Sequence, residues 1–171
     1  MSIELLVLRL IHVLCGIFWV GSALFTGFFL FPALATPGSQ PGPVINALRQ
    51  RGLMTALPIA ALLTIGSGLR LMSLTSARFS GAWFATSPGR AYAFAGAAAI
   101  VAFLISLLVA RPAAVKSAQL GGALASAPPE QRAALGAQLA SLRRRNSVSS
   151  SVVLALLIFA AAGMSIARYL V

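Results

Sequence analysis

Acidic residues are almost absent from this chain of 171 residues, which contains no aspartate and only two glutamates, Glu4 and Glu130. The two glutamates stand far apart in the sequence, which excludes paired-carboxylate chemistry, and without aspartate there is no Ser–His–Asp triad. A single cysteine, Cys15, excludes an intrachain disulfide, and no Cys-x-x-Cys-His motif for covalent haem attachment is present. These absences leave no catalytic constellation and favour a non-enzymatic role.

Long uncharged apolar runs dominate the sequence instead. Hydrophobic residues make up 59% of the chain and charged residues 9%, a balance that is untypical of a soluble domain. Runs at roughly 10–35, 52–69, 91–110 and 146–167 are each long enough to cross a hydrocarbon layer of ~30 Å as an α-helix. We predict an all-α polytopic membrane protein, a single domain over 1–171 with transmembrane helices at roughly 5–34, 52–73, 88–111 and 146–170.

Prolines and small polar residues indicate where the spans begin and end. The run 36–43 contains Pro37 and further prolines and glycines, and it cannot continue the first helix. Ser87 and Pro88 are typical of the N-cap and first residue of a helix and predict the start of the third span there. Pro58 lies inside the second span and predicts a kink, because proline lacks an N–H donor and clashes with the preceding turn.

The connection between the third and fourth spans, residues 112–145, predicts a protruding basic helical hairpin. Pro128-Pro129-Glu130 is typical of a helix start, and leucines follow at positions 135, 139 and 142, on one helical face. The fourth helix is therefore expected to begin in water near Pro129 and to run on into the membrane. Its leucines are expected to pack against the segment 113–124; a partner-binding face is the alternative.

Thirteen Lys and Arg residues give the chain a formal charge of +11, and most stand next to a span, where anionic lipid head groups attract them. No fold or aromatic platform for nucleic acid accompanies them, so we expect no nucleic-acid partner. Eight lie in the first-to-second and third-to-fourth connections, and five lie on the other side. By the positive-inside rule, both termini are expected in the periplasm and the basic hairpin in the cytoplasm, as in a bacterial inner-membrane protein.

Arginines stand at the same-side end of each of the four spans. They are Arg9, Arg70, Arg90 and Arg168, which would surround one mouth of a four-helix bundle. They either extend to lipid phosphates, as long side chains at helix ends do, or form a site for an anionic group such as a carboxylate or a haem propionate.

The first span carries the residues to which chemistry is most readily assigned. His12, Gly16, Trp19 and Ala23 share one helical face, and an ionisable group at membrane depth is a functional candidate. The alternative is a neutral histidine hydrogen-bonded to a backbone carbonyl or to a Ser or Thr of a neighbouring helix. Close helix contact is expected at the glycines of the first two spans, Gly16, Gly21, Gly27, Gly66 and Gly68.

The pattern His12-x3-Gly16-x2-Trp19-x-Gly21, followed by Phe25, Phe28 and Phe-Pro-Ala-Leu at 31–34, resembles the first membrane helix of small bacterial proteins of the CopD-like group. It is also similar to the membrane domain of bacterial membrane-bound urate oxidases. The segment 63–69, Leu-Thr-Ile-Gly-Ser-Gly-Leu, resembles the second helix of relatives. The resemblance covers about the first seventy residues, and it implies a redox-related membrane role that involves copper or haem.

Taken together, these features lead to b-type haem as the specific expectation. His12 is expected as the proximal iron ligand, with Met164 or Met72 as the second axial ligand, or with two His12 residues meeting across a dimer axis. Arg9, Arg70, Arg90 and Arg168 would receive the propionates, and Trp19 and Gly16 would pack against the ring or the bundle.

Two alternatives to haem binding remain. One is a non-enzymatic accessory or assembly subunit of a larger membrane complex, in which His12 and the glycines serve packing. The other is copper or small-solute handling. For copper, a single histidine, no Met-x3-Met pair and no intramembrane carboxylate offer few ligands.

Overall fold

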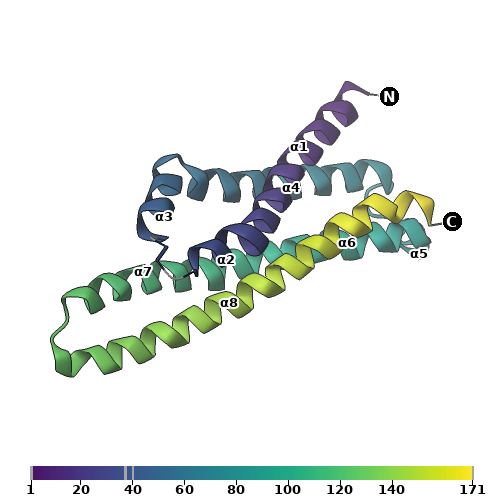
Figure 1. The fold of residues 1–171 in the computed structure, drawn as a ribbon. Helices are drawn as coiled ribbons and strands as arrows, with labels where there is room; N and C mark the ends of the chain where they lie inside the picture. The colour runs from purple at the N-terminus through teal and green to yellow at the C-terminus, as the bar shows by residue number, and fades with distance from the viewer. Residues whose placement is uncertain (1, 37, 40, 171) are drawn as a thin grey trace.

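The computed structural model describes residues 2–36, 38–39 and 41–170, and it is helical nearly throughout, with no strand in these ranges (Figure 1). Four helical stretches are long and apolar enough to cross a membrane: Ile3–Leu34, Leu53–Thr75, Ser87–Ser126 and Pro129–Tyr169. The predicted all-α class with four such helices is confirmed. Pro37, expected to end the first span, lies outside the described residues.

The elements follow one another along the chain with short connections. They are α1 (Ile3–Phe25), the π-helical segment η1 (Thr26–Leu30), α2 (Phe31–Leu34), α3 (Pro41–Gln50), α4 (Leu53–Thr75), α5 (Gly81–Ala85), α6 (Ser87–Ile105), the π-helical segment η2 (Ser106–Ala110), α7 (Arg111–Ser126), α8 (Pro129–Ile166) and the 3-10 turn η3 (Ala167–Tyr169). Both described ends and α5 lie at one end of the molecule, and the α7–α8 turn lies at the other (Figure 1).

Helix boundaries agree with the sequence signals with one correction. The last helix begins at Pro129, as predicted, and runs without interruption to Ile166. The N-cap of α6 is Thr86 and not Ser87, because Thr86 has an extended backbone and its Oγ1 accepts the N–H of Gly89 at 3.1 Å. Pro58 lies in the second turn of α4, which continues through it as one helix.

The long helices pack as two antiparallel pairs. The most extensive contacts join α1 to α4 and α6 to α8, and α7 continues the second pair along the first half of α8 (Figure 1). The pairs meet at a core that includes Trp19, Ala61 and Leu157. There the Trp19 ring lies edge-on to Phe103, with centroids 6.4 Å apart. This junction holds the two halves of the bundle together.

Small residues allow close contact at some of the predicted positions only. A Cβ at Gly27 would lie 2.9 Å from a methyl carbon of Leu154, and one at Gly68 would lie 2.7 Å from the His12 ring. The prediction is wrong for Gly21 and Gly66, where a Cβ would meet nothing within 4 Å, because these faces point away from the neighbouring helices. In the second pair, a Cβ at Gly163 would lie 3.0 Å from the Cβ of Ala95.

The two π-helical segments share a local cause. Each begins at a hydroxyl residue, Thr26 or Ser106, and each is followed at the same spacing by a proline, Pro32 or Pro112. Proline offers no N–H and its ring clashes with the carbonyl four residues earlier, so an α-helical turn is disfavoured at this point. The wider turn, closed by the N–H of the residue before each proline, relieves that clash and lets the helix continue.

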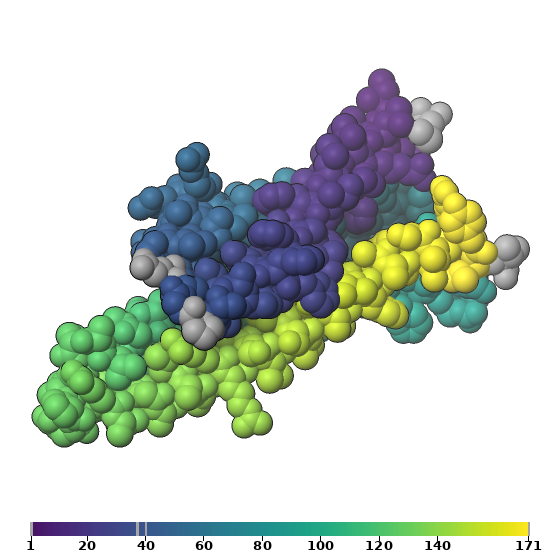
Figure 2. All heavy atoms as spheres, viewed as in Figure 1, coloured from purple at the N-terminus to yellow at the C-terminus, as the bar shows by residue number. Residues whose placement is uncertain are grey.

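The outer surface of the bundle is strongly apolar. Large side chains such as Ile17, Phe29, Phe94 and Leu108 are each about two-thirds exposed, as expected for helices that face lipid. Figure 2 shows the α7–α8 end extending beyond the α1–α4 pair. The α6–α7 and α8 stretches, of 40 and 41 residues, are about twice as long as a bilayer core requires.

Candidate ligand site at His12

His12 faces α4 of its own chain and is held there by the backbone. Its Nδ1 lies 2.8 Å from the carbonyl oxygen of Thr64. A carbonyl can only accept, so Nδ1 carries the proton and donates it. In the neutral imidazole, Nε2 is then unprotonated and has a free lone pair. This Nδ1-protonated tautomer is found in metal-ligating histidines that donate to a backbone carbonyl.

The hydroxyl groups of Thr64 and Ser67 bond to carbonyls of their own helix. Ser67 Oγ lies 3.5 Å from His12 Nδ1 and donates to Leu63 O and Thr64 O. The hydroxyl of Thr64 donates to Ala60 O at 2.8 Å. The polar groups next to the imidazole are therefore satisfied within α4, and none competes for Nε2.

Gly68 makes the space for the imidazole. A Cβ at this position would lie 2.7 Å from His12 Cε1 and 3.0 Å from Nδ1, closer than real Cβ contacts allow. Gly16, which was expected to pack against the haem ring or the bundle, faces α4, and a Cβ there would make an ordinary contact of 3.6 Å with Thr64 Cγ2. The glycine that the imidazole requires lies on α4 because the His12 side chain crosses to that helix.

A small cavity adjoins the imidazole at the centre of the bundle. It has a volume of about 40 Å³ and is lined by residues of all four long helices, among them His12, Met72, Gly96 and Met164. A Cβ at Gly96 would lie 3.7 Å from Met72 Cε and 3.9 Å from Met164 Cε. The two methionines that the sequence offered as alternative second ligands therefore lie together at one site.

These side chains form a soft donor set. An imidazole nitrogen and two thioether sulfurs suit Cu(I) better than they suit Mg²⁺ or Ca²⁺. Among the described residues, no group of three or more His, Cys, Asp and Glu side chains could hold a metal ion. Any ion at His12 would therefore depend on the methionines.

The cavity also limits the size of a ligand. At about 40 Å³ it can hold a single ion or water, whereas pockets for organic cofactors measure ~300 Å³ or more. Haem b does not fit the site as it stands. The dimer alternative requires His12 on an outer face of α1, but His12 faces α4 within its own chain.

Trp19 and the four arginines lie outside the cavity. Trp19 is 7% exposed in the core between the helix pairs, so its contact is with the bundle. Arg70 donates from Nη2 and Nε to Glu4 Oε1, at 2.6 and 2.9 Å. Arg168 lies over the ring of Tyr169. Arg9 and Arg90 are exposed, and none of the four arginines lines the His12 cavity.

The residues that sequence reasoning missed are the partners on α4 and α6. Thr64, Ser67 and Gly68 position the imidazole, and Gly96 adjoins both methionine side chains. A usable signal was present, because Thr64, Ser67 and Gly68 are spaced to share one face of a helix. Which face of α4 meets His12 depends on the packing of the helices and cannot be read from one segment.

Comparison with known proteins adds no relative to this geometry. No family model, curated protein or solved structure matches the chain.

Proposed function

We propose that this chain is a multi-pass protein of a bacterial inner membrane that handles copper by binding one Cu(I) ion with His12, Met72 and Met164. The observation that carries the proposal is the shared cavity. Two methionine side chains adjoin His12 there, and the Nδ1–H of His12 donates to Thr64 O. Cu(I) prefers such thioether and imidazole ligands.

Each neighbouring residue has a defined part in this proposal. The Thr64 carbonyl fixes the tautomer and the ring orientation of His12, and Gly68 leaves room for the ring. Ile65, Ala99 and Ile100 complete an apolar wall, which excludes water and favours a soft, weakly hydrated ion. Bound Cu(I) would be either cargo or a one-electron redox centre.

The test is a titration of purified protein in detergent with Cu(I), in competition with a chromophoric Cu(I) chelator. We expect one Cu(I) per chain, with binding lost in His12→Ala and weakened at least ~10-fold in Met72→Leu/Met164→Leu. Met54→Leu is the matched control, because Met54 also lies on α4 but is 44% exposed and does not line the cavity.

Three outcomes would contradict the copper proposal. Equal weakening by Met54→Leu would place Cu(I) elsewhere on the chain. A Soret band that disappears in His12→Ala would show that haem b enters after the helices separate. A colourless, folded protein that retains no Cu(I) and comigrates with membrane partners would support the accessory-subunit role.

The orientation is part of the proposal and has its own test. The larger number of Lys and Arg residues on the side of the α7–α8 end, eight against five, supports periplasmic termini and a cytoplasmic α7–α8 end. In a Cys15→Ser background, a cysteine introduced at exposed Ala134 on α8 should resist a membrane-impermeant maleimide in intact cells and react after lysis. Labelling in intact cells would invert the orientation.

A further inference from the structure

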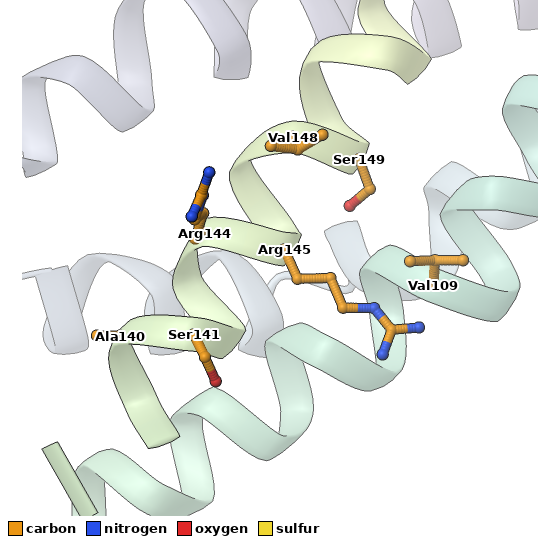
Figure 3. A pocket seen from close by; sticks show the side chains of 7 residues that line it. All are labelled: Val109, Ala140, Ser141, Arg144, Arg145, Val148 and Ser149. Carbon is orange, nitrogen blue, oxygen red and sulfur yellow. The ribbon is translucent and has the colours of Figure 1, made fainter. Parts of the chain in front are cut away.

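An open groove lies where the α7–α8 end joins the rest of the bundle. Its volume is about 660 Å³, and its lining includes Val109 of η2 and, from α8, Ser141, Arg144, Arg145, Val148 and Ser149 (Figure 3). Figure 3 shows Arg145 reaching from α8 toward the helix that carries Val109, with the Ser149 side chain directed to the same gap. The groove is separate from the His12 cavity.

The groove carries positive charge with no carboxylate to balance it. The only ion pair in the part of the chain that the structure describes joins Arg70 to Glu4. Ser141 and Ser149 donate their hydroxyls to carbonyls of their own helix, at 2.8 and 3.0 Å. The donors left for a ligand are therefore the guanidinium groups of Arg144 and Arg145, whose planar forks match phosphate oxygens.

The groove also lies at the level where two apolar runs end. Charge first appears after η2 at Arg111, and the uncharged run of α8 begins just after Arg145. These helices are neighbours that run in opposite directions (Figure 1). Val109 and Arg145 line the same groove, so both transitions fall at the same height. Basic residues at this height in a membrane protein meet lipid phosphates.

The groove is also lined by apolar side chains, next to the arginines and toward the uncharged runs. Val109 and Val148 line it beside the arginines, and Val148 is 59% exposed. A free phosphate would contact only the guanidinium groups. A phospholipid would place its phosphate on the arginines and an acyl chain along the valines, so charge and apolar surface are both matched.

We infer that this groove binds an anionic glycerophospholipid, with its phosphate held by Arg145 at the gap, Arg144 on the adjoining side of α8 adding a second guanidinium group, and an acyl chain against Val109 and Val148. This is a discrete site and differs from the general attraction of a basic surface to a bilayer. The neighbouring Arg143 allows the two kinds of binding to be distinguished by experiment, because it carries the same charge on the same helix and does not line the groove.

The experiment measures lipid binding to delipidated protein in detergent by native mass spectrometry and by the shift in unfolding temperature. The probes are phosphatidylglycerol, phosphatidylcholine and inorganic phosphate. Each arginine near an anionic surface contributes a factor of roughly five in affinity, so Arg144→Gln/Arg145→Gln should weaken phosphatidylglycerol binding about 25-fold. Arg143→Gln should weaken it less than about fivefold, the value for one arginine at the surface.

Further results separate a site from its alternatives. Arg144→Lys/Arg145→Lys should give intermediate affinity, because lysine keeps the charge and loses the fork. The single variants Arg144→Gln and Arg145→Gln change the charge by the same amount as Arg143→Gln, so equal losses in all three would show diffuse attraction and overturn the inference. Stabilisation by inorganic phosphate equal to that by phosphatidylglycerol would also overturn it, since the acyl chain would then contribute nothing.

Discussion

The α1–α4 and α6–α8 pairs have the same antiparallel arrangement but different contact surfaces. Between α6 and α8, many of the buried residues are small and apolar, among them Ala95, Ala98 and Ala160. Between α1 and α4, the His12 imidazole meets the carbonyl of Thr64 and the hydroxyl of Ser67. The polar groups beside His12 thus distinguish the first pair from the second, and they are the basis of the proposed copper site.

The contrast is sharper because α1 and α6 share other features. In each helix a glycine, Gly16 or Gly96, lies ten residues before the hydroxyl residue that opens the π-helical segment. Four residues before these glycines stand His12 and Tyr92. The Tyr92 ring stacks on Trp83, with centroids 6.3 Å apart, whereas His12 turns into the bundle. At the same position relative to the glycine and the π-helical segment, α1 thus carries a histidine that lines the cavity and α6 carries a tyrosine that does not.

The largest expected loss of stability comes from the contact between α6 and α8. Gly163→Leu would place carbon atoms against Ala95, whose Cβ already lies 3.0 Å from a Cβ at this position. Forcing α6 and α8 apart should lower the free energy of unfolding by about 3 kcal/mol, measured by denaturation in mixed micelles. Gly136→Leu, on the same helix with nothing within 4 Å, is the control and should change stability far less.

The junction between the two pairs comes next. Leu157 is 1% exposed in the core, and Leu157→Ala should lower the free energy of unfolding by about 2 kcal/mol because the neighbours cannot fill the cavity. The adjacent Ile158 is 43% exposed, and Ile158→Ala should be nearly neutral. Similar losses in both variants would mean that the pairs do not meet at Leu157.

A smaller loss of stability is expected from a substitution in the contact between α1 and α4 at His12. Gly68→Ala brings a Cβ within 2.7 Å of the His12 ring, so the imidazole must move away from Thr64. We expect a loss of about 1 kcal/mol in stability together with weakened Cu(I) binding. Gly66→Ala has open space at its Cβ and should leave both properties unchanged. Unchanged Cu(I) binding in Gly68→Ala would show that the ring position does not matter for a ligand.

The smallest expected effect on stability is that of His12 itself. His12→Leu removes one hydrogen bond between helices, and such bonds contribute about 0.6 kcal/mol in membrane proteins. Thr64 O keeps a hydrogen bond from Ser67 Oγ at 3.2 Å, which limits the loss. Thermal unfolding should therefore change little while Cu(I) binding disappears. A loss comparable to that of Leu157→Ala would make His12 a structural residue.

Much of the fold could be predicted because it depends on local properties. The length of each apolar run, the helix start at Pro129 and the all-α class follow from segments read one at a time. The site was only half predictable. His12, Met72 and Met164 were named from the sequence as candidate ligands, but their partners Thr64, Gly68 and Gly96 depend on how the helices are rotated against each other.

The contact glycines show the same limit. Gly66 and Gly68 are two residues apart, and only the second faces His12. A single sequence gives the spacing on one helix, but it does not give the angle at which that helix meets its neighbour. For the same reason Arg70 was placed at a ligand site, although in the structure it pairs with Glu4.

The π-helical segment η2 determines which way α7 faces. A π-helical turn takes in one more residue than an α-helical turn, so every residue after it is turned back by about 100° compared with an uninterrupted α-helix. In this setting Ala113 is 5% exposed, and Arg111 and Lys116 remain exposed. The extra residue of η2 therefore sets the rotation of α7 about its own axis. Without it, the same α7 sequence would present a different side to α8.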